Sequence, residues 1–244
     1  MLFLKKKKIP FEDIIPDNYI DIHSHLLPGI DDGVKTIYQS AYVLEQFYHM
    51  GVTKLITTPH SMKDVWPNTA DIIMAKLKEM KTLLPTLDIP INLHAAAEYM
   101  LDDLFLKHLK DKDVLTLKDT YILVEMSTFN PPINLNELLF DIKLSEYIPI
   151  LAHPERYSFY HNNFQKFAEL KDSGFLFQLN LLSISGYYGE RVKKTALRLL
   201  EEGYYDFSGS DVHNRKQFES LEKGFYSKDA KKLKILMENN RQFA

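Results

Sequence analysis

Apolar and polar positions alternate in blocks along the chain, and short apolar segments are followed by segments with helical periodicity. Apolar runs rich in β-branched and aromatic residues favour strands, whereas apolar residues recurring every three or four positions favour amphipathic helices. The predicted strands span residues 18–26, 52–60, 91–99, 121–127, 148–156, 175–183 and 205–213. The predicted helices span residues 36–51, 69–84, 101–110, 134–146, 163–174 and 190–203, and further helices complete the chain.

This alternation predicts an α/β fold with parallel strands, because a strand followed by a helix about seven times is typical of consecutive βαβ units. No linker rich in Pro, Gly or Ser divides the units, so we expect one domain over residues 19–244 after an N-terminal extension, 1–18. Seven units suit a closed or nearly closed barrel better than an open sheet. The predicted fold is therefore a single distorted (β/α)7-type barrel, similar to a TIM barrel.

Composition narrows the possible functions. The 244 residues are 45% hydrophobic and 26% charged, as in ordinary globular proteins, and the absence of cysteine excludes disulfides and thiolate nucleophiles. The net charge of −3 does not indicate nucleic-acid binding. No apolar run reaches the roughly 20 residues of a transmembrane helix, so we expect a cytoplasmic protein without a transmembrane segment. Lys5 to Lys8 are interpreted as a solvated tail, with weak contact to anionic lipid or an acidic partner as the alternative.

Side chains that bind metal ions gather at or just after the ends of the predicted strands. The carboxyl ends of parallel strands in a barrel open on one face, so we expect these side chains to converge there. His23 and His25 are two residues apart, as are Asp211 and His213, so each pair points to one side of an extended strand. The candidate ligands are His23, His25, Asp32, His60, Glu98, Glu125, His153, Asp211 and His213.

Imidazole and carboxylate ligands without thiolates suit Zn²⁺, Mn²⁺ or Fe²⁺. Nine candidate ligands exceed the needs of one ion, so we predict two to three divalent transition-metal ions bridged by carboxylates. A single histidine is more often a hydrogen-bonded structural residue than a ligand. We interpret the histidines outside the strand-end pattern in that way, namely His49, His94, His108 and His161.

The motifs DIHSHLLPGIDDG, TPH, AAEYM, LVEMS, AHPERY and SGSDVHN occur in this order from about Tyr19 onward. Together they resemble the PHP (polymerase and histidinol phosphatase) superfamily, and within it the bacterial protein-tyrosine phosphatases of capsule and exopolysaccharide operons. The resemblance covers nearly the whole chain except the first 18 residues. It implies a distorted α/β barrel, the PHP fold, with usually three metal ions at its mouth, and manganese is our first choice.

The resemblance also implies roles for individual residues. Arg156 matches the phosphate-binding arginine, and Arg215 is a second candidate. His60 or His213, if not fully committed to metal, could protonate the leaving group. The implied ligands of the first ion are His23, His25, Glu98 and Asp211. A second ion would share Glu98 and add Glu125 and His153. A third would take Asp32, which Asp31 could replace, together with His60 and His213.

The activity implied is hydrolysis of phosphotyrosine on a protein, with a bacterial tyrosine kinase as the expected partner. A small-molecule phosphatase of the histidinol-phosphate type and a catalytically silent metal-binding adaptor are alternatives, whereas the acidic net charge disfavours DNA cleavage. We expect at least one aromatic residue to line the mouth and favour phosphotyrosine. The candidates are Tyr99, Phe129, Tyr157, Tyr187 and Tyr188.

Overall fold

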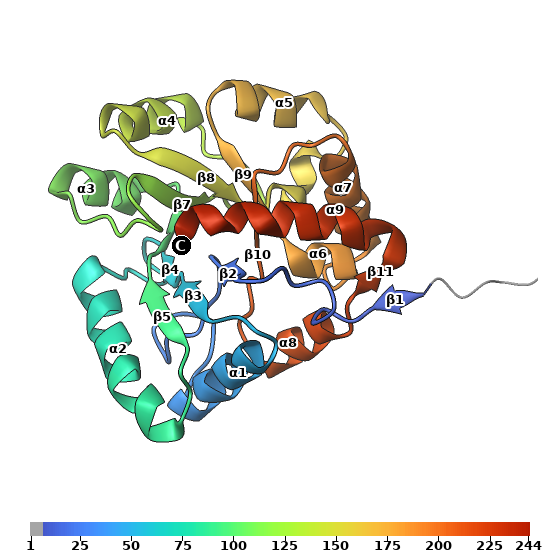
Figure 1. The fold of residues 1–244 in the computed structure, drawn as a ribbon. Coiled ribbons are helices and arrows are strands. Elements are labelled where there is room, and N and C mark those ends of the chain that lie inside the picture. Colours follow the sequence, from blue (N-terminus) through green and yellow to red (C-terminus); the bar gives the residue numbers. More distant parts are fainter. Residues whose placement is uncertain (1–6) are drawn as a thin grey trace, which may run out of the picture.

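Parallel strands occupy the centre of the molecule and helices lie around them (Figure 1). The computed structural model describes residues 7–244. The central strands are β2 (Ile20–Asp21), β3 (Lys54–Thr57), β4 (His60–Ser61), β5 (Asn92–Ala95), β6 (Glu98–Met100), β7 (Tyr121–Glu125), β8 (Ile148–Ala152), β9 (Leu176–Asn180) and β10 (Phe207–Gly209). They form a six-stranded sheet in the order β10-β9-β8-β7-β6-β4 and a three-stranded sheet in the order β2-β3-β5.

The helices follow the strands in the predicted alternation, and several begin at side-chain caps. The Thr36 hydroxyl accepts a hydrogen bond from Gln39 N while the Gln39 side chain accepts one from Thr36 N, which forms a capping box. None of the helices within residues 7–244 has the length and apolar character needed to cross a bilayer. The α-helices are α1 (Ile37–His49), α2 (Ala70–Leu83), α3 (Asp103–Asp111), α4 (Leu135–Leu144), α5 (Gln165–Asp172), α6 (Leu181–Ser185), α7 (Glu190–Glu201), α8 (Arg215–Glu222) and α9 (Ser227–Glu238). The 3₁₀ helices are η1 (Leu84–Leu87), η2 (Pro154–Arg156), η3 (Ser158–Tyr160) and η4 (Asn239–Phe243).

The second and third predicted strands are each divided in two. The first halves, β3 and β5, pair in the three-stranded sheet, and the second halves, β4 and β6, pair in the six-stranded sheet. Strand β3 ends at Thr57, and the next backbone amide, Thr58 N, donates to Ser24 O at 2.7 Å. The breaks place His60 and Glu98 at the starts of new strands, directly opposite each other in register.

The two parallel sheets are linked beside β2 and β10. An isolated parallel bridge joins Ser24 to Val212, and His25 N donates to Val212 O at 3.0 Å. Asp211 N donates to His23 O at 2.7 Å. The fold is therefore mixed α/β with parallel sheets that meet at the predicted ligand segments, and a closed barrel stays a prediction.

The sixth predicted strand, 175–183, extended too far. Strand β9 ends at Asn180, and the next residues form the short helix α6. The Asn180 side chain caps this helix by accepting a hydrogen bond from Leu182 N at 2.8 Å. An apolar run such as Leu181 to Ser183 fits a buried helix as well as a buried strand, so periodicity could not separate the two.

The N-terminal segment packs on the body of the protein. Strand β1 (Lys8–Ile9) pairs antiparallel with β11 (Phe225–Tyr226), and the buried ring of Phe11 lies edge-on to Phe225 with ring centroids 6.0 Å apart. The predicted lysine tail lies partly outside the described residues, because the description begins at residue 7. The proposed boundary after residue 18 stays a prediction.

Candidate metal centre

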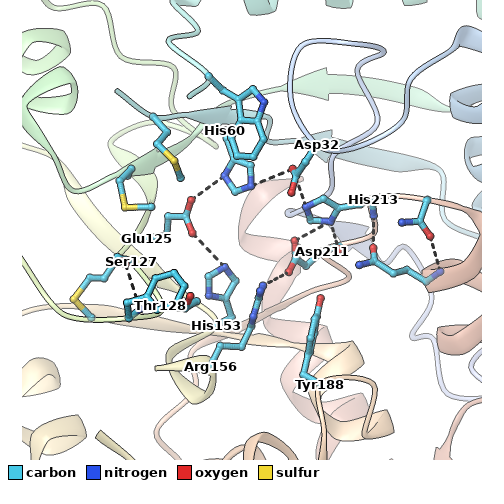
Figure 2. A pocket seen from close by; sticks show the side chains of 17 residues that line it. Asp32, His60, Glu125, Ser127, Thr128, His153, Arg156, Tyr188, Asp211 and His213 are labelled. Carbon is cyan, nitrogen blue, oxygen red and sulfur yellow. Dashed lines mark hydrogen bonds and ion pairs between the residues drawn. The ribbon is translucent and has the colours of Figure 1, made fainter. Parts of the chain in front are cut away.

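All nine predicted ligands lie at one end of the parallel strands and face a common centre. Each belongs to at least one group whose nitrogen or oxygen atoms lie within 4.8 Å of one another. These groups are His25, Asp32, His60 and His213; His23, Glu98 and His153; His23, His25 and Asp211; and His60, Glu98 and Glu125. Figure 2 shows the side chains from this cluster that line the adjoining cavity.

Two of the imidazoles are held by hydrogen bonds on the side away from the centre. His23 Nδ1 lies 2.6 Å from Gln178 Oε1, and His25 Nδ1 lies 2.8 Å from Asp31 Oδ2. Because both partners are oxygen acceptors, they place the proton on Nδ1 and direct Nε2 to the centre. Asp31 therefore orients His25, rather than replacing Asp32 in the cluster.

His213 has the same arrangement. Its Nδ1 donates to the Asp211 backbone carbonyl at 2.9 Å, and its backbone N donates to Gln217 Oε1 at 2.6 Å. The opposite nitrogen, Nε2, lies 3.4 Å from Asp32 Oδ1. Asp32 is the most exposed member of the cluster, with 47% of its side chain accessible, and it lies at the edge of the cavity.

Four atoms at the innermost part of the cluster lie close together. Five of the six separations between them are 3.2 to 3.3 Å. Ligands at 2.0–2.2 Å from a tetrahedral ion lie about 3.4 Å from one another, so these five separations are close to those between ligands of one transition-metal ion. The four atoms are His23 Nε2, His25 Nε2, Glu98 Oε2 and Asp211 Oδ1.

Several buried polar atoms in the cluster have no hydrogen-bond partner within residues 7–244, although buried polar groups normally have partners. Three such atoms are Glu98 Oε2, Glu125 Oε1 and His60 Nδ1. His60 Nδ1 approaches the Glu125 oxygen to 2.8 Å and the Glu98 oxygen to 3.1 Å without hydrogen-bonding geometry. Divalent cations at the centre would satisfy these atoms, so the residues present fit metal ions.

The histidines and carboxylates of the cluster strongly shift one another's pKa values. Burial disfavours the charged imidazolium of His23, but the carboxylates of Glu98 and Asp211 outweigh burial and raise the pKa of His23 to about 10. Burial also disfavours the Glu98 and Asp211 carboxylates, yet the neighbouring histidines hold the pKa of both well below the usual range. Without a metal ion, protonated histidines therefore supply the positive charge that the carboxylates require.

Two of the predicted ligands have strained backbone conformations. His153 and Asp211 adopt left-handed φ values of 37° and 51°, which cost non-glycine residues free energy. Such strain concentrates at functional sites, where the surrounding structure holds it. The left-handed turns redirect the chain immediately after β8 and β10 and bring both side chains into the cluster.

A cavity of about 700 Å³ opens beside the cluster, and Arg156 extends into it (Figure 2). Arg156 Nη1 donates to Asp211 Oδ2 at 3.1 Å, and its guanidinium carbon lies 4.4 Å from the centre of the Tyr188 ring. Asn180 Nδ2 donates to the same Asp211 oxygen at 2.6 Å. These contacts fix the guanidinium next to the predicted metal ligands.

Some predicted site residues lie elsewhere. Arg215 begins α8 with its side chain 66% exposed, where it pairs with Glu219 at 2.7 Å and lies over the Tyr42 ring. Tyr99 and Tyr157 are buried core residues whose hydroxyl groups bond backbone atoms. Tyr187 is absent from the cavity lining, whereas Phe129 and Tyr188 are part of it. The structure does not bring the following residues into the cluster: His49, His94, His108, His161 and Arg215.

Sequence reasoning missed residues that support or border the site. Gln178 and Asn180 are fully buried and hydrogen-bond to ligand candidates, and their signal was two amides within an otherwise apolar strand. Trp66 lines the cavity and stacks on His60, with ring centroids 5.1 Å apart and planes at 14°. A lone tryptophan in a predicted loop carried no signal for this position.

The family pattern described as "Capsular polysaccharide synthesis, CpsB/CapC" matches residues 19–233. The chain belongs to the CpsB/CapC family. It is 30% identical over 196 residues to the putative tyrosine-protein phosphatase CapC of Staphylococcus aureus, covering 80% of this chain and 77% of that protein. It is 30% identical over 241 residues to the tyrosine-protein phosphatase CpsB of Streptococcus pneumoniae, covering 90% and 98% respectively.

Solved structures agree with this membership. A structure from work on YwqE of Bacillus subtilis and CpsB of Streptococcus pneumoniae, described as metal-dependent tyrosine phosphatases, superposes with a TM-score of 0.80 and 29% identity. The match covers 92% of this chain and 93% of that chain. The phosphotriesterase homology protein of Escherichia coli has a TM-score of 0.56 at 12% identity over 94% of this chain and 99% of that chain, so it shares the fold alone.

Proposed function

We propose that this protein is a metal-dependent protein-tyrosine phosphatase that hydrolyses phosphotyrosine on a protein substrate. The observation that carries this proposal is the cavity in which a cluster of imidazoles and carboxylates adjoins a fixed arginine. The named activities of the CapC, YwqE and CpsB relatives support the same reaction class. The chain has no cysteine, so hydrolysis through a cysteinyl phosphate is excluded.

Binding of the phosphate group is assigned to Arg156. A guanidinium offers paired N–H donors that match two phosphate oxygens, and it remains charged at all physiological pH values. Asp211 and Tyr188 hold this group in place, so little side-chain freedom is lost when substrate binds. Divalent ions held by the cluster would lower the pKa of water and neutralise phosphate charge.

Departure of the tyrosine side chain requires less assistance than departure of an alkoxide, because the phenol pKa is about 10. His60 and His213 both line the cavity, and their Nε2 atoms each lie 3.4 Å from Asp32 Oδ1. We propose that one of these two imidazoles, when it is not fully committed to a metal ion, donates a proton to the leaving oxygen from Nε2.

The finer features of the proposal extend the family resemblance. We assign two to three ions to the cluster, with manganese first and iron or zinc as substitutes, distributed over the nine ligands as the resemblance implies. The parallel sheets would form the distorted seven-unit barrel around them. The proposed substrate is the tail of a bacterial tyrosine kinase that controls capsule or exopolysaccharide synthesis.

The proposal is tested by comparing substrates with the protein loaded with Mn²⁺. A phosphotyrosine peptide, histidinol phosphate and single-stranded DNA should be assayed at equal metal content, and kcat/KM should be highest for the peptide. A preference of more than tenfold for histidinol phosphate would place the protein among small-molecule phosphatases. Absence of turnover on every phosphate ester, with metal bound, would instead support a metal-binding adaptor.

A further inference from the structure

We propose that one wall of the cavity is a binding surface for the substrate's phenyl ring and selects aryl phosphates over alkyl phosphates. This inference rests on the proposed function and deepens it, because it assigns substrate selection to residues outside the metal cluster. We call this surface the aryl wall. It consists of Met62, Trp66, Met100 and Phe129.

The cavity has two chemically different sides. Its lining includes the charged and polar groups of the cluster and Arg156, and also three methionines, Trp66 and Phe129. In Figure 2 the side chains with yellow sulfur atoms, which are the methionines of the lining, lie on the side of Glu125 and Ser127, away from Asp211 and His213. A phosphate bound at Arg156 would therefore leave its organic substituent next to an apolar surface.

The backbone fixes Met62 and Trp66 beside each other. Met62 N donates to Trp66 O at 2.8 Å, and Trp66 N donates to Met62 O at 3.0 Å. This exchange of hydrogen bonds closes a tight turn in which Asp64 has a left-handed φ of 63°. Trp66 also stacks on His60, so its indole lies directly beside a predicted metal ligand.

Phe129 supplies the outer part of the wall. Its side chain is 88% exposed although it is large and apolar, and it borders the cavity. Exposed apolar groups that border a concave site are typical of ligand-binding surfaces. Met126, by contrast, is fully buried and cannot contact a bound ring. Its backbone is held in place because Met126 N donates to the Tyr157 hydroxyl at 3.0 Å.

These residue types suit an aromatic ring. Aromatic pairs in stacked or edge-on arrangements gain about 0.5–1.5 kcal/mol beyond burial, and thioether sulfur makes favourable contacts with ring edges. The short alkyl arm of phosphoserine cannot cover the wall when its phosphate is held by Arg156. The charged or polar imidazole of histidinol phosphate would lose hydration against the methionines.

Direct binding of two phosphonates to the Mn²⁺-loaded protein tests the aryl wall without relying on turnover. Phenylphosphonate and methylphosphonate share one head group, so the ratio of their dissociation constants isolates the contribution of the ring. Calorimetry should give a phenylphosphonate affinity about tenfold or more above that of methylphosphonate, as expected for partial burial of a ring.

Two variants and one matched control locate the effect. Phe129→Ala and Trp66→Ala should each reduce the affinity ratio about threefold or more while changing methylphosphonate binding less than twofold. Phe140→Ala removes an aromatic side chain of similar exposure, 65%, from α4 outside the cavity, and it should leave the ratio unchanged. Metal content should be measured for each variant, because Trp66 contacts His60.

The outcomes separate this inference from the proposed function. A wild-type ratio near one, or equal weakening of both phosphonates in Phe129→Ala, would overturn the aryl wall even if phosphotyrosine is hydrolysed. A tenfold ratio that falls in Phe129→Ala would support the wall even if no phosphotyrosine turnover is found, and the proposed function would then fail alone.

Discussion

At the residue scale, the two predicted arginines have opposite environments. Arg156 lies beside the metal ligands and is held by Asp211, whereas Arg215 pairs with Glu219 on the surface of α8. Each arginine follows a candidate ligand in the sequence: Arg156 is three residues after His153, and Arg215 is two residues after His213. Their positions differ because η2 turns Arg156 back over the strand ends, while α8 carries Arg215 away from them.

This difference gives a matched pair of variants. Arg156→Ala should reduce kcat/KM for a phosphotyrosine peptide by roughly 10²-fold or more, as for other electrostatic stabilisers of a transition state. Arg215→Ala should change kcat/KM by less than twofold, because its ion pair is exposed and contributes little. Steady-state kinetics at equal metal content measure both, and wild-type kinetics for Arg156→Ala would show that the phosphate binds elsewhere.

Protonation of His23 gives a second prediction. Its pKa is about 10 in the folded protein without metal, compared with 6.5 for an unperturbed histidine, so the folded metal-free protein holds this proton at neutral pH. The raised pKa contributes stability that is complete below about pH 6.5 and is lost as the pH rises toward 10. An imidazole that binds a metal ion must be neutral, so metal binding should release protons and strengthen as the pH rises.

Proton release can be measured by titrating Mn²⁺ into the metal-free protein at pH 7.5 in two buffers of different ionisation enthalpy. The heats should differ and correspond to at least one proton released per chain. His161→Ala is a suitable control, because His161 lies outside the cluster and bonds the Glu155 carbonyl. Identical heats in both buffers would contradict protonation of the cluster.

The ligand candidates could be predicted from sequence because metal-binding side chains recur where apolar runs end, and parallel strands align those ends. The supporting residues could not be predicted in this way. Gln178 and Asn180 are two amides in an otherwise apolar strand, and the strand pattern does not indicate which side chains they bond. Only the folded structure shows that they bond His23 and Asp211. Trp66 depends on a turn that pairs it with Met62, which no periodicity indicates.

At the scale of elements, strand β10 must lie close to the segment that carries His23. A Cβ atom added at Gly209 would lie 2.5 Å from His23 Cβ and 2.9 Å from the Gln178 side chain. No side chain fits there without moving the imidazole that Gln178 orients. The glycine therefore allows β10 to place Asp211 and His23 around one centre.

Gly209→Ala should consequently displace His23, lower the metal content and reduce turnover tenfold or more, with a loss of about 1–3 kcal/mol in unfolding free energy. Gly203→Ala is the control, since no atom lies within 4 Å of its added Cβ and only its left-handed φ of 74° opposes alanine. That variant should lose about 1 kcal/mol and keep its metal. Metal analysis with thermal unfolding distinguishes them, and full metal content in Gly209→Ala would contradict the close approach.

Sequence periodicity predicted the order of strands and helices but not where strands break. The breaks after β3 and β5 occur because the chain leaves one ladder and enters another, with Thr58 bonding Ser24 of the neighbouring segment. Such exchanges depend on contacts between distant residues, which local patterns do not contain. They matter for function because β4 and β6 begin with His60 and Glu98.

At the scale of the whole molecule, the parallel sheets bring together candidate ligands from seven chain segments that span residues 23 to 213. Six of the nine central strands, or the segments that follow them, therefore contribute to one centre, and the CpsB/CapC family match extends over residues 19–233. Metal ions that bind the folded protein and not the unfolded chain should make the metal-bound protein more stable than the metal-free protein. The cluster thus connects folding, metal content and activity.

The central claim is that several metal ions in this cluster are required for phosphotyrosine hydrolysis. The most direct measurement is turnover of a phosphotyrosine peptide as Mn²⁺ is returned to chelated protein, with bound ions per chain determined at each step. We expect no turnover after chelation and full turnover only when two to three ions are bound per chain. Full turnover with one ion or fewer per chain would contradict the account.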